Sequence, residues 1–572
     1  MPNRKPLLLL LLAISYVAAA CAPPDPAEPP AATAEQEQEQ DYTTAAVAMP
    51  DKYGAAISEE ILRAGGNAVD AGIAAGFALA VSFPEAGNIG GGGFMLIRMN
   101  GEDSFIDYRE KAPGAADRDM YLDENEDVIK GASLVGHLSV GVPGSVAGFW
   151  EAHKRYGTLP WKDLIAPAIR LAEEGFEVPQ KLGGGMLSRL EMYEGKTNFS
   201  DYFGRMKSGE MHKQPELAAT LKRIAENGVD EFYKGETADL IVAEMERGGG
   251  LITLEDLAAY QAVWREPLRA NWRGYEIVSA PLPSSGGFAL IQLLKIRDYL
   301  SHHFQDVPHN SAQYVHLVAE IEKRVFADRG EYLGDPDFVD ARLDDLLDDE
   351  YIERRAQEIN PSEISMDVIA GAGLDTHDTT HYSVLDKWGN AISNTYTLNL
   401  GFGSGVVVEG AGFLLNDEMD DFSVKSGVPN AYGVVGNEAN EIQPGKRMLS
   451  SMTPTILLKD GEVAMVVGTP GGSTIFTSVF QTVMNIVDFG MTPLAAIDAA
   501  RFHHQLLPPD MILIGKSRPL PDETMSALAD RGYKTINPFD FGDMQVIYVD
   551  GEKVDAASDP RNRGESRIIE GN

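Results

Sequence analysis

The spacing of apolar residues predicts a pair of helices near the start of the folded part of the chain. Residues 58–64 and 67–81 repeat apolar side chains at helical spacing, with two glycines between the segments. Asn67 and Asp70 have the spacing of a capping pair at a helix start, and Pro84 ends the second segment. Because this stretch is rich in alanine and glycine, we expect both helices to be buried.

The next segment predicts a β-hairpin. Residues 94–99 and 104–109 flank Asn100-Gly101, a dipeptide that favours the tight turn between two antiparallel strands. Arg109 therefore leaves the end of a strand.

Strand patterns return in the last third of the chain. Residues 379–385 and 391–398 form one predicted hairpin, and residues 454–458 and 463–467 form another. Both pairs are separated by short turn segments that contain glycine.

Helical patterns occupy much of the remaining chain. Residues 145–374 alternate helical patterns with loops, and an apolar-periodic segment that follows residues 470–473 predicts a helix to about residue 488. No low-complexity linker interrupts the sequence after residue 44, so we expect one continuous globule. Hairpins backed by helices in both halves predict an α+β fold with two sheets between helical layers.

The first residues have the order of an export signal. Arg4 and Lys5 precede a leucine-rich run over residues 7–17, and small alanines stand before Cys21. The run is too short to span a bilayer permanently. Cys21 stands where a lipoprotein signal places its acylated cysteine; the alternative is ordinary cleavage after an Ala-x-Ala site. We favour the lipoprotein interpretation, with residues 1–20 as the signal peptide and a periplasmic, lipid-anchored product.

Composition adds three constraints. The chain has 86 acidic and 48 basic residues and a formal net charge of −38, so it repels polyanions, and we expect no nucleic-acid partner. A single cysteine permits no disulfide within the chain. Residues 21–44 consist largely of Pro, Ala, Glu and Gln, cannot bury enough apolar surface to fold, and are predicted to form a disordered tether.

A pair of threonines suggests a specific chemistry. Thr379 follows Asp378, and Thr397 lies eighteen residues later on the returning strand of a predicted hairpin. A threonine hydroxyl is a weak nucleophile until a base takes its proton, and a threonine at a chain terminus carries that base as its own α-amine. Thr397 can hold the Thr379 hydroxyl by a hydrogen bond. Taken alone, however, such a run is more often an ordinary half-exposed strand.

Further motifs accompany this pair in one order along the chain. They are Pro84-Glu-Ala-Gly-Asn-Ile-Gly-Gly-Gly-Gly-Phe94, Asp107-Tyr-Arg-Glu110, Gly412-Phe-Leu-Leu-Asn-Asp-Glu-Met-Asp-Asp-Phe422, Leu449-Ser-Ser-Met452, Gly468-Thr-Pro-Gly-Gly-Ser473 and Ala557-Ser-Asp-Pro-Arg561. Together they resemble the gamma-glutamyltranspeptidase family of N-terminal nucleophile hydrolases. The resemblance implies a four-layer αββα sandwich, made as a precursor that cleaves itself between Asp378 and Thr379. The products would be a large subunit, residues 45–378, and a small subunit, residues 379–572.

The resemblance also implies which side chains recognise the γ-glutamyl group. Arg109 would hold the substrate's α-carboxylate, which a guanidinium can bind bidentately, with help from Ser450 and Ser451. From the residues alone, Arg109 has an equal chance of being a surface arginine paired with Glu110. The groups implied for the substrate's ammonium are Asn399, Glu418 and Asp421.

Two glycines and a tyrosine complete the implied site. Gly471 and Gly472 match the backbone donors of an oxyanion hole, at the start of a predicted helix whose dipole favours negative charge. Without the resemblance, a plain tight turn after Pro470 would be the better interpretation. Tyr432 matches a tyrosine that gates the pocket, within a lid-like segment over residues 426–434.

The implied activity is that of a glutathione hydrolase and gamma-glutamyltransferase. A γ-glutamyl ester of Thr379 would form from glutathione or another γ-glutamyl compound and be resolved by water or by an amino acid or dipeptide acceptor. No spacing calls for a metal or an organic cofactor. We interpret His503-His504 as structural and the acidic run at residues 344–350 as a solvated face, with a metal site as its less favoured alternative; His381 could assist processing.

Three other functions compete with this one. A cephalosporin acylase of the same superfamily acts on glutaryl groups that lack the α-amine, and Glu418 with Asp421 argue against it. An enzyme that transfers or trims poly-γ-glutamate would lack the lid segment. A ligand-binding lipoprotein without chemistry has no need for the Thr379 and Thr397 pair.

Overall fold

The computed structural model describes residues 44–366, 379–425, 427–428 and 436–571. The chain separates into two units, residues 1–40 and residues 41–572, and all the described residues belong to the second. Cys21, Asp378 and Tyr432 lie outside the described residues, as do the predicted signal segment and all but the last residue of the predicted tether.

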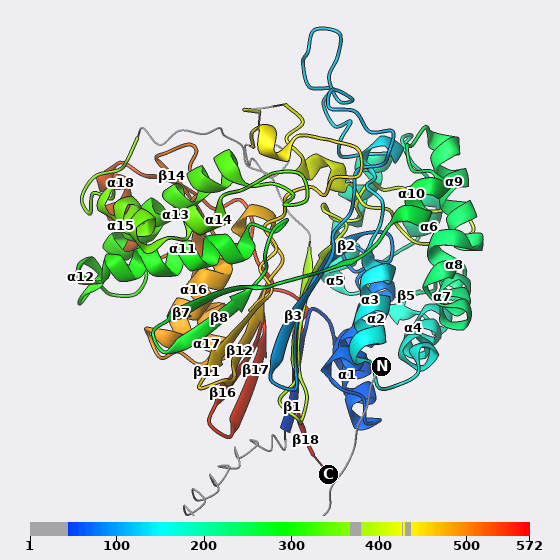
Figure 1. The fold of residues 1–572 in the computed structure, drawn as a ribbon, viewed down its shortest axis with the longest axis horizontal. Helices are drawn as coiled ribbons and strands as arrows, with labels where there is room; N and C mark the ends of the chain where they lie inside the picture. Colours follow the sequence, from blue (N-terminus) through cyan, green and yellow to red (C-terminus); the bar gives the residue numbers. More distant parts are fainter. Residues whose placement is uncertain (1–43, 367–378, 426, 429–435, 572) are drawn as a thin grey trace, which may run out of the picture. The chain divides into compact units, whose positions relative to one another are not determined.

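Two antiparallel sheets form the centre of the second unit, with helices on both outer sides (Figure 1). The seven-stranded sheet has the order β18 (Glu565–Glu570), β1 (Thr44–Met49), β9 (Thr380–Leu385), β10 (Ala391–Thr397), β2 (Gly92–Met99), β3 (Glu102–Tyr108) and β6 (Val263–Arg265). The six-stranded sheet has the order β17 (Lys553–Ser558), β16 (Gln545–Asp550), β12 (Glu462–Gly468), β11 (Thr455–Lys459), β8 (Tyr275–Ser279) and β7 (Leu268–Trp272). The predicted α+β sandwich of four layers is confirmed.

The helices divide between the outer sides of the two sheets (Figure 1). On the side of the seven-stranded sheet are α1 (Lys52–Arg63), α2 (Ala68–Ser82), α3 (Ser145–Tyr156), α4 (Trp161–Glu174), α5 (Gln180–Tyr193), α6 (Phe199–Phe203), α7 (Pro215–Asn227), α8 (Val229–Lys234), α9 (Glu236–Gly248) and α10 (Leu254–Ala259). On the other side are α11 (Gly286–Tyr299), α12 (Ser301–Phe304), α13 (Ala312–Tyr332), α14 (Leu343–Leu346), α15 (Asp349–Gln357), α16 (Ile475–Val487), α17 (Pro493–Asp498) and α18 (Asp522–Arg531). Among the described helices, none has both the length and the apolar character needed to cross a membrane.

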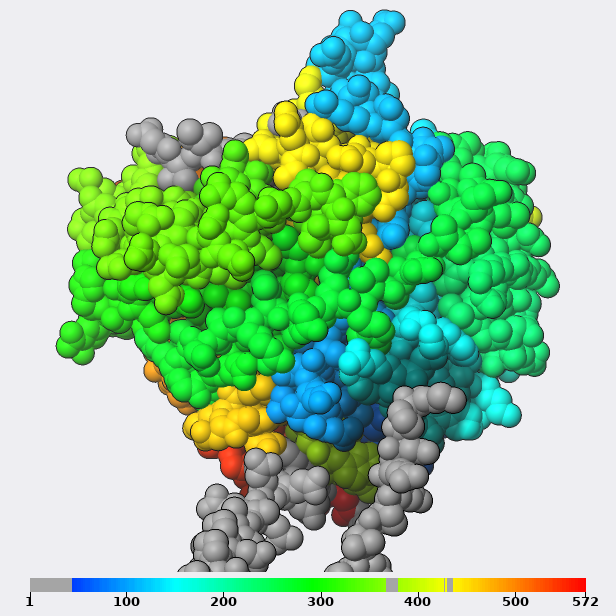
Figure 2. Space-filling view, viewed as in Figure 1, coloured from blue at the N-terminus to red at the C-terminus, as the bar shows by residue number. Residues whose placement is uncertain are grey.

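Short elements complete the fold. Two small sheets contain β4 (Phe176–Glu177) with β5 (Met211–His212), and β13 (Phe502–His503) with β14 (Met511–Ile514) and β15 (Lys534–Ile536). Figure 2 shows the segment between β3 and α3 projecting from the surface at the top of the view.

Strand β2 shows how side-chain alternation divides the interior. Met95 and Ile97 pack in the cluster that contains the helices of the first layer, whereas Phe94 and Leu96 pack with residues of the six-stranded sheet such as Val466. Because both faces of β2 are covered, all eight of its residues are buried.

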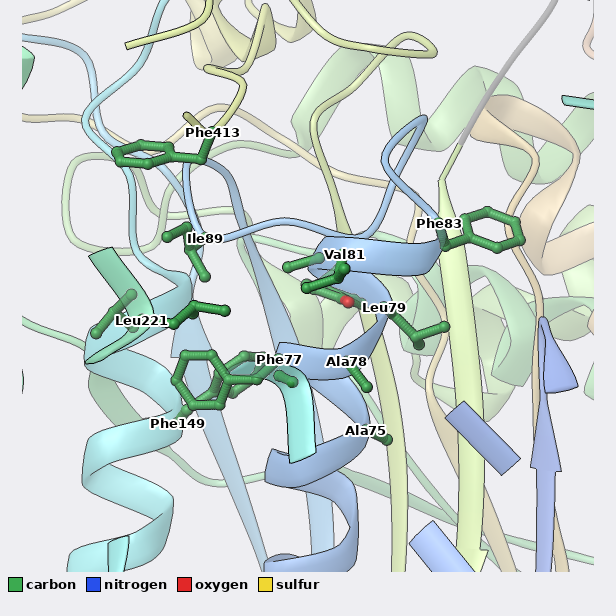
Figure 3. Close-up of a cluster of buried hydrophobic side chains, with 14 of the residues drawn as sticks. Ala75, Phe77, Ala78, Leu79, Val81, Phe83, Ile89, Phe149, Leu221 and Phe413 are labelled. Atoms are coloured by element: carbon green, nitrogen blue, oxygen red, sulfur yellow. The ribbon is translucent and has the colours of Figure 1, made fainter. Parts of the chain in front are cut away.

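Helix α2 lies directly on the seven-stranded sheet. All fifteen of its residues are buried, and Figure 3 shows Phe77 and Val81 among Phe149, Leu221 and Phe413 from other segments. An element covered on every side needs apolar or small residues all round, which explains its alanine-rich sequence.

The predicted capping pair is present at the start of α2. The Asn67 side chain accepts a hydrogen bond from the Asp70 N–H at 3.0 Å, and the Asp70 carboxylate accepts one from the Asn67 N–H at 3.1 Å. The prediction for the preceding helix was wrong at its start, since α1 begins at Lys52 rather than at residue 58. Asp51 caps it by accepting a hydrogen bond from Gly54 N–H at 2.7 Å.

The predicted hairpin after residue 379 is formed by β9 and β10. Thr380 pairs with Tyr396, so the strand end at Thr397 lies beside Thr379. β9 also pairs with β1, and β10 pairs with β2. The hairpin from after residue 378 therefore lies between two strands from before it in this sheet.

Two glycines of α2 lie where this helix closely approaches the hairpin and helix α3. The hydroxyl of Tyr382 donates to the carbonyl of Gly72 at 2.8 Å, and that of Tyr396 donates to the carbonyl of Gly76 at 3.0 Å. A Cβ at Gly76 would lie 2.5 Å from Cζ of Phe149.

We expect Gly76→Ala to destabilise the protein by about 1–3 kcal/mol, because the clash outweighs the better helix propensity of alanine. Gly184→Ala in α5 is the matched control, since a Cβ there meets no heavy atom within 4 Å. That control should be neutral or should stabilise by up to about 1 kcal/mol. The measurement is the urea midpoint of each variant, and equal shifts for the two would contradict the packing argument.

Candidate active site

Thr379 lies at the start of β9, and its hydroxyl meets that of Thr397. The two Oγ1 atoms are 3.3 Å apart. The backbone N–H of Asn399 donates to Thr397 Oγ1 at 2.8 Å, and the Thr397 hydroxyl also lies 3.5 Å from the Asn399 carbonyl. Asn399 has a positive φ of 80°, and its side-chain amide donates to the Asp417 carbonyl at 3.0 Å. The predicted contact between the two threonines is thus present.

A small cavity opens beside this threonine pair. Its volume is about 20 Å³, roughly the space that one water requires. The lining residues are Arg109, Arg329, Thr379, Thr397, Glu418, Asp421, Ser450, Ser451, Met452, Gly472, Ser473 and Ile475. Eight of the residues named from the sequence therefore meet here, whereas Asn399 and Gly471 are not part of this lining.

Arg109 carries the central charge of the cavity. Its fully buried guanidinium, at the end of β3, forms ion pairs with both Glu418 and Asp421 of the turn Glu418–Asp421 and lies 3.6 Å from Glu110. The resemblance assigns the arginine to the α-carboxylate of a substrate and the acids to its ammonium; here the arginine and the acids bind one another.

Burial shifts the ionisation of these acids. It raises the pKa of Glu418 well above its usual range and the pKa of Glu110 to about 8, in each case against the attraction of Arg109. The pKa of Asp421 is also raised by burial, although Arg109 opposes the shift. Burial alone would lower the pKa of Arg109, but Glu418 and Asp421 raise it above its ordinary value. Arg109 therefore stays protonated, whereas the acids around it lose their protons less readily than they would in water.

Arg329 is a second buried cation that the sequence analysis missed. Its Nε donates to Ser285 Oγ at 2.9 Å, and its Nη2 donates to Ser451 Oγ at 3.0 Å. Burial lowers its pKa to about 10, and nearby Asp421 counteracts part of this effect. The sequence does not distinguish Arg329 as a site residue. Other charged residues of α13, among them Glu322 and Lys323, are buried as well and do not line the cavity.

The glycine loop before α16 borders the same cavity. Gly471 and Gly472 have positive φ values of 140° and 53°, and a Cβ at Gly471 would lie 2.5 Å from Thr474 Oγ1. The Ser473 hydroxyl donates to Gln505 Oε1 at 2.8 Å, which holds the loop from one side. Because the N-terminal end of a helix favours negative charge, the start of α16 suits an anion in this cavity.

The histidines near the site are buried and neutral. His381 hydrogen-bonds through Nδ1 to Thr395 at 2.7 Å and through Nε2 to Ser383 at 3.1 Å, and burial lowers its pKa to about 3. Burial also lowers the pKa of His503 to about 4 and that of His504 to about 3. Within the described part of the chain, no group of three or more His, Cys, Asp or Glu side chains has the arrangement of a metal site.

Comparisons with known proteins agree with this geometry. A family model described as Gamma-glutamyltranspeptidase matches residues 54–569. The "Glutathione hydrolase proenzyme" of Pseudomonas aeruginosa is 56% identical over 92% of this chain and 94% of its own length. The protein of the same name from Escherichia coli is 46% identical over 90% of each chain.

Two solved structures show the same fold. A cephalosporin acylase from Bacillus halodurans, 29% identical, has a TM-score of 0.80 over 92% of this chain and 95% of its own. A gamma-glutamyltranspeptidase from Pseudomonas nitroreducens, 55% identical, has a TM-score of 0.55 over 55% of this chain and 94% of its own. The residues matched by the family model and the identity to the curated relatives show that the chain belongs to the gamma-glutamyltranspeptidase family.

Proposed function

We propose that this chain is the self-cleaving precursor of a glutathione hydrolase and gamma-glutamyltransferase with Thr379 as its nucleophile. The observation that carries the proposal is the Thr379 hydroxyl, 3.3 Å from that of Thr397, at a cavity that also holds Arg109, Glu418 and Asp421. Two relatives aligned over 92% and 90% of this chain are named glutathione hydrolase proenzymes.

The first half-reaction forms an ester on Thr379. Cleavage after Asp378 frees the Thr379 α-amine, which takes the proton of Thr379 Oγ as that oxygen attacks the γ-carbonyl carbon of the substrate. The N–H groups of Gly471 and Gly472 donate to the oxyanion that develops. The C–N bond then breaks, the proton passes to the leaving nitrogen, and the γ-glutamyl group remains on Oγ.

The second half-reaction removes the γ-glutamyl group. Water, or the amine of an amino acid or dipeptide, attacks the ester carbonyl while the α-amine accepts its proton. The bond between that carbonyl carbon and Thr379 Oγ breaks, and Oγ regains a proton. Water yields glutamate, and an amine yields a new γ-glutamyl amide.

The charges of the cavity match a zwitterion. Arg109 and Arg329 supply two cations, and Glu418 and Asp421 supply two acids. A γ-glutamyl head carries one ammonium and one carboxylate, so it can exchange into an existing pair without leaving a buried charge unpaired. In this exchange Arg109, with the Ser450 and Ser451 hydroxyls, takes the carboxylate, and the two acids take the ammonium. A ligand that carries only a carboxylate, or only an ammonium, would separate Arg109 from its acids and leave one of these buried charges without a partner.

We also propose that the protein is exported to the periplasm and anchored by a lipid on Cys21. Support comes from the sequence alone, in which Arg4 and Lys5 precede an apolar run and small residues precede Cys21.

We expect Thr379→Ala to remain a single chain and to lose hydrolysis of a γ-glutamyl anilide, because it lacks the attacking oxygen. Intact mass should locate the wild-type cut between Asp378 and Thr379. Thr380→Ala is the control, since the buried Thr380 hydroxyl makes no hydrogen bond among the described residues, and it should still be cut. An uncut wild-type chain would overturn the proposal.

Asp421→Asn should lower kcat/KM for a γ-glutamyl anilide by about 30-fold or more, because loss of one partner of a buried charge pair costs ~2 kcal/mol or more. For a glutaryl anilide, which has no ammonium, the loss should be much smaller. Asp420→Asn serves as the control, because Asp420 accepts a hydrogen bond from Ser133 at 2.6 Å and is not among the residues lining the cavity. Equal losses on both substrates would instead favour an acylase.

The acid limb of the plot of kcat/KM against pH should reflect the pKa of the Thr379 α-amine. A free α-amine has a pKa of about 7.7–8. Activity should fall as pH drops through that value, since the protonated amine is no base. Because the pKa of His381 is about 3, His381→Gln should leave the position of this limb unchanged, whatever its effect on the maximal rate. A limb displaced by a full pH unit in that variant would identify the histidine as the base.

A further inference from the structure

Thr379 borders a second, larger cavity. Its volume is about 210 Å³, against about 20 Å³ for the first. Thr379 lines both cavities, Gly472 lines the first and Gly471 lines the second. The two spaces therefore meet where the γ-carbonyl of a substrate would sit.

The division of charges assigns one part of the substrate to each cavity. The first cavity holds the groups suited to the γ-glutamyl head, so the group on the other side of the scissile amide must extend from Thr379 into the second. The second cavity has an aromatic side: Phe83 and Phe541 line it, and Phe83 also belongs to the buried apolar cluster drawn in Figure 3. Such walls suit a peptide leaving group or an incoming peptide.

Helix α5 gives the second cavity a basic side. Lys181, Gly185 and Arg189 are spaced four residues apart, lie on one helix face and line the cavity. A Cβ at Gly185 would meet no heavy atom within 4 Å, so the helix face between the two cations is open. Lys181 is exposed, and its Nζ donates a hydrogen bond of 3.3 Å to the Arg561 carbonyl.

Other charged groups in the lining have partners within the protein. Arg561 donates to the carbonyls of Asp498 and Ala499 at 3.0 and 2.6 Å and pairs with Asp559. These contacts commit its guanidinium to the end of α17 and leave Lys181 better placed to meet a ligand.

The acids of the lining are likewise held. Asp540 accepts a hydrogen bond from Ser517 N–H at 2.7 Å, and Asp543 accepts one from Asn562 Nδ2 at 2.7 Å. Glu85 forms an ion pair of 2.7 Å with Arg563. Arg563 offsets the negative charge of Glu85, and Arg561 and Lys181 act on the carboxylate of Asp540. Burial raises the pKa of Asp543 to about 7, which reduces its negative charge near neutral pH.

We propose that this second cavity binds the free carboxylate of the leaving or accepting amino acid or peptide, with Lys181 on α5 as its principal cation. The inference rests on the proposed function, since it presupposes a γ-glutamyl ester on Thr379. It makes α5 the element that selects acceptors with a free carboxyl end. Arg189, on the same helix face, adds positive potential.

The test compares two acceptors of one acyl-enzyme. The probes are glycylglycine and glycylglycinamide, which differ in the charge of the carboxyl end, with a γ-glutamyl anilide as donor. Because both acceptors meet the same ester, the ratio of their kcat/KM values cancels any change in ester formation. We expect Lys181→Glu to lower the ratio of kcat/KM for glycylglycine to kcat/KM for glycylglycinamide by about three- to tenfold. This is the range expected when a partly exposed ion pair is replaced by repulsion. Lys181→Ala should lower the ratio by a smaller factor.

Lys196→Glu is the matched control. Lys196 is also exposed, also donates to a backbone carbonyl, that of Met192 at 3.0 Å, and is not among the residues lining the cavity. It makes the same change in net charge and should leave the ratio unchanged.

Two results would overturn the inference. The first is an unchanged ratio in both Lys181 variants, which includes an equal loss for the two acceptors. The second is the same fall of the ratio in Lys196→Glu, which would show that the net charge of the protein, and not Lys181, sets the preference. A wild-type protein that releases no anilide would instead refute the proposed function, and the subsite with it.

Discussion

The pairing of β9 with β10 fixes the distance on which the proposed chemistry depends. A shift of one residue in this register would turn every side chain of the hairpin to the opposite face and would separate Thr379 from Thr397. Contacts on the helical face prevent such a shift, because the hydroxyls of Tyr382 and Tyr396 reach backbone carbonyls of α2 at 2.8 and 3.0 Å. The glycines of α2 are therefore part of the positioning of the threonine pair, although they lie away from it.

Charge balance is the second constraint on the site. A guanidinium as deeply buried as that of Arg109 is tolerated only beside acids, and Glu418 and Asp421 provide them. The same acids carry raised pKa values because they too have lost water. Such an arrangement is costly for folding and is typical of a site shaped by recognition rather than by stability.

Local signals in the sequence predicted the elements that frame the site, and tertiary packing decided the rest. The hairpins, the Asn67 cap and the proximity of Thr379 to Thr397 followed from turn residues, capping residues and strand alternation. The early start of α1 depended on Asp51, whose capping role the apolar pattern does not reveal. Arg329 was missed because its position in the site depends on how α13 packs against Ser285 and Ser451, which are distant in sequence. The direct pairing of Arg109 with its acids likewise requires three-dimensional information.

The mixed origin of the strands in both sheets has a consequence for the protein after the proposed cut. β1 and β2 flank the β9–β10 hairpin, and β8 pairs with β11, so each sheet is built from segments on both sides of residue 378. Before the cut, unfolding and refolding involve one molecule. Afterwards the same transition releases two chains, its equilibrium depends on their concentration, and dilution opposes reassembly. The cut protein would then owe its lifetime to slow unfolding, which is kinetic stability, and a molecule that unfolds would not readily refold.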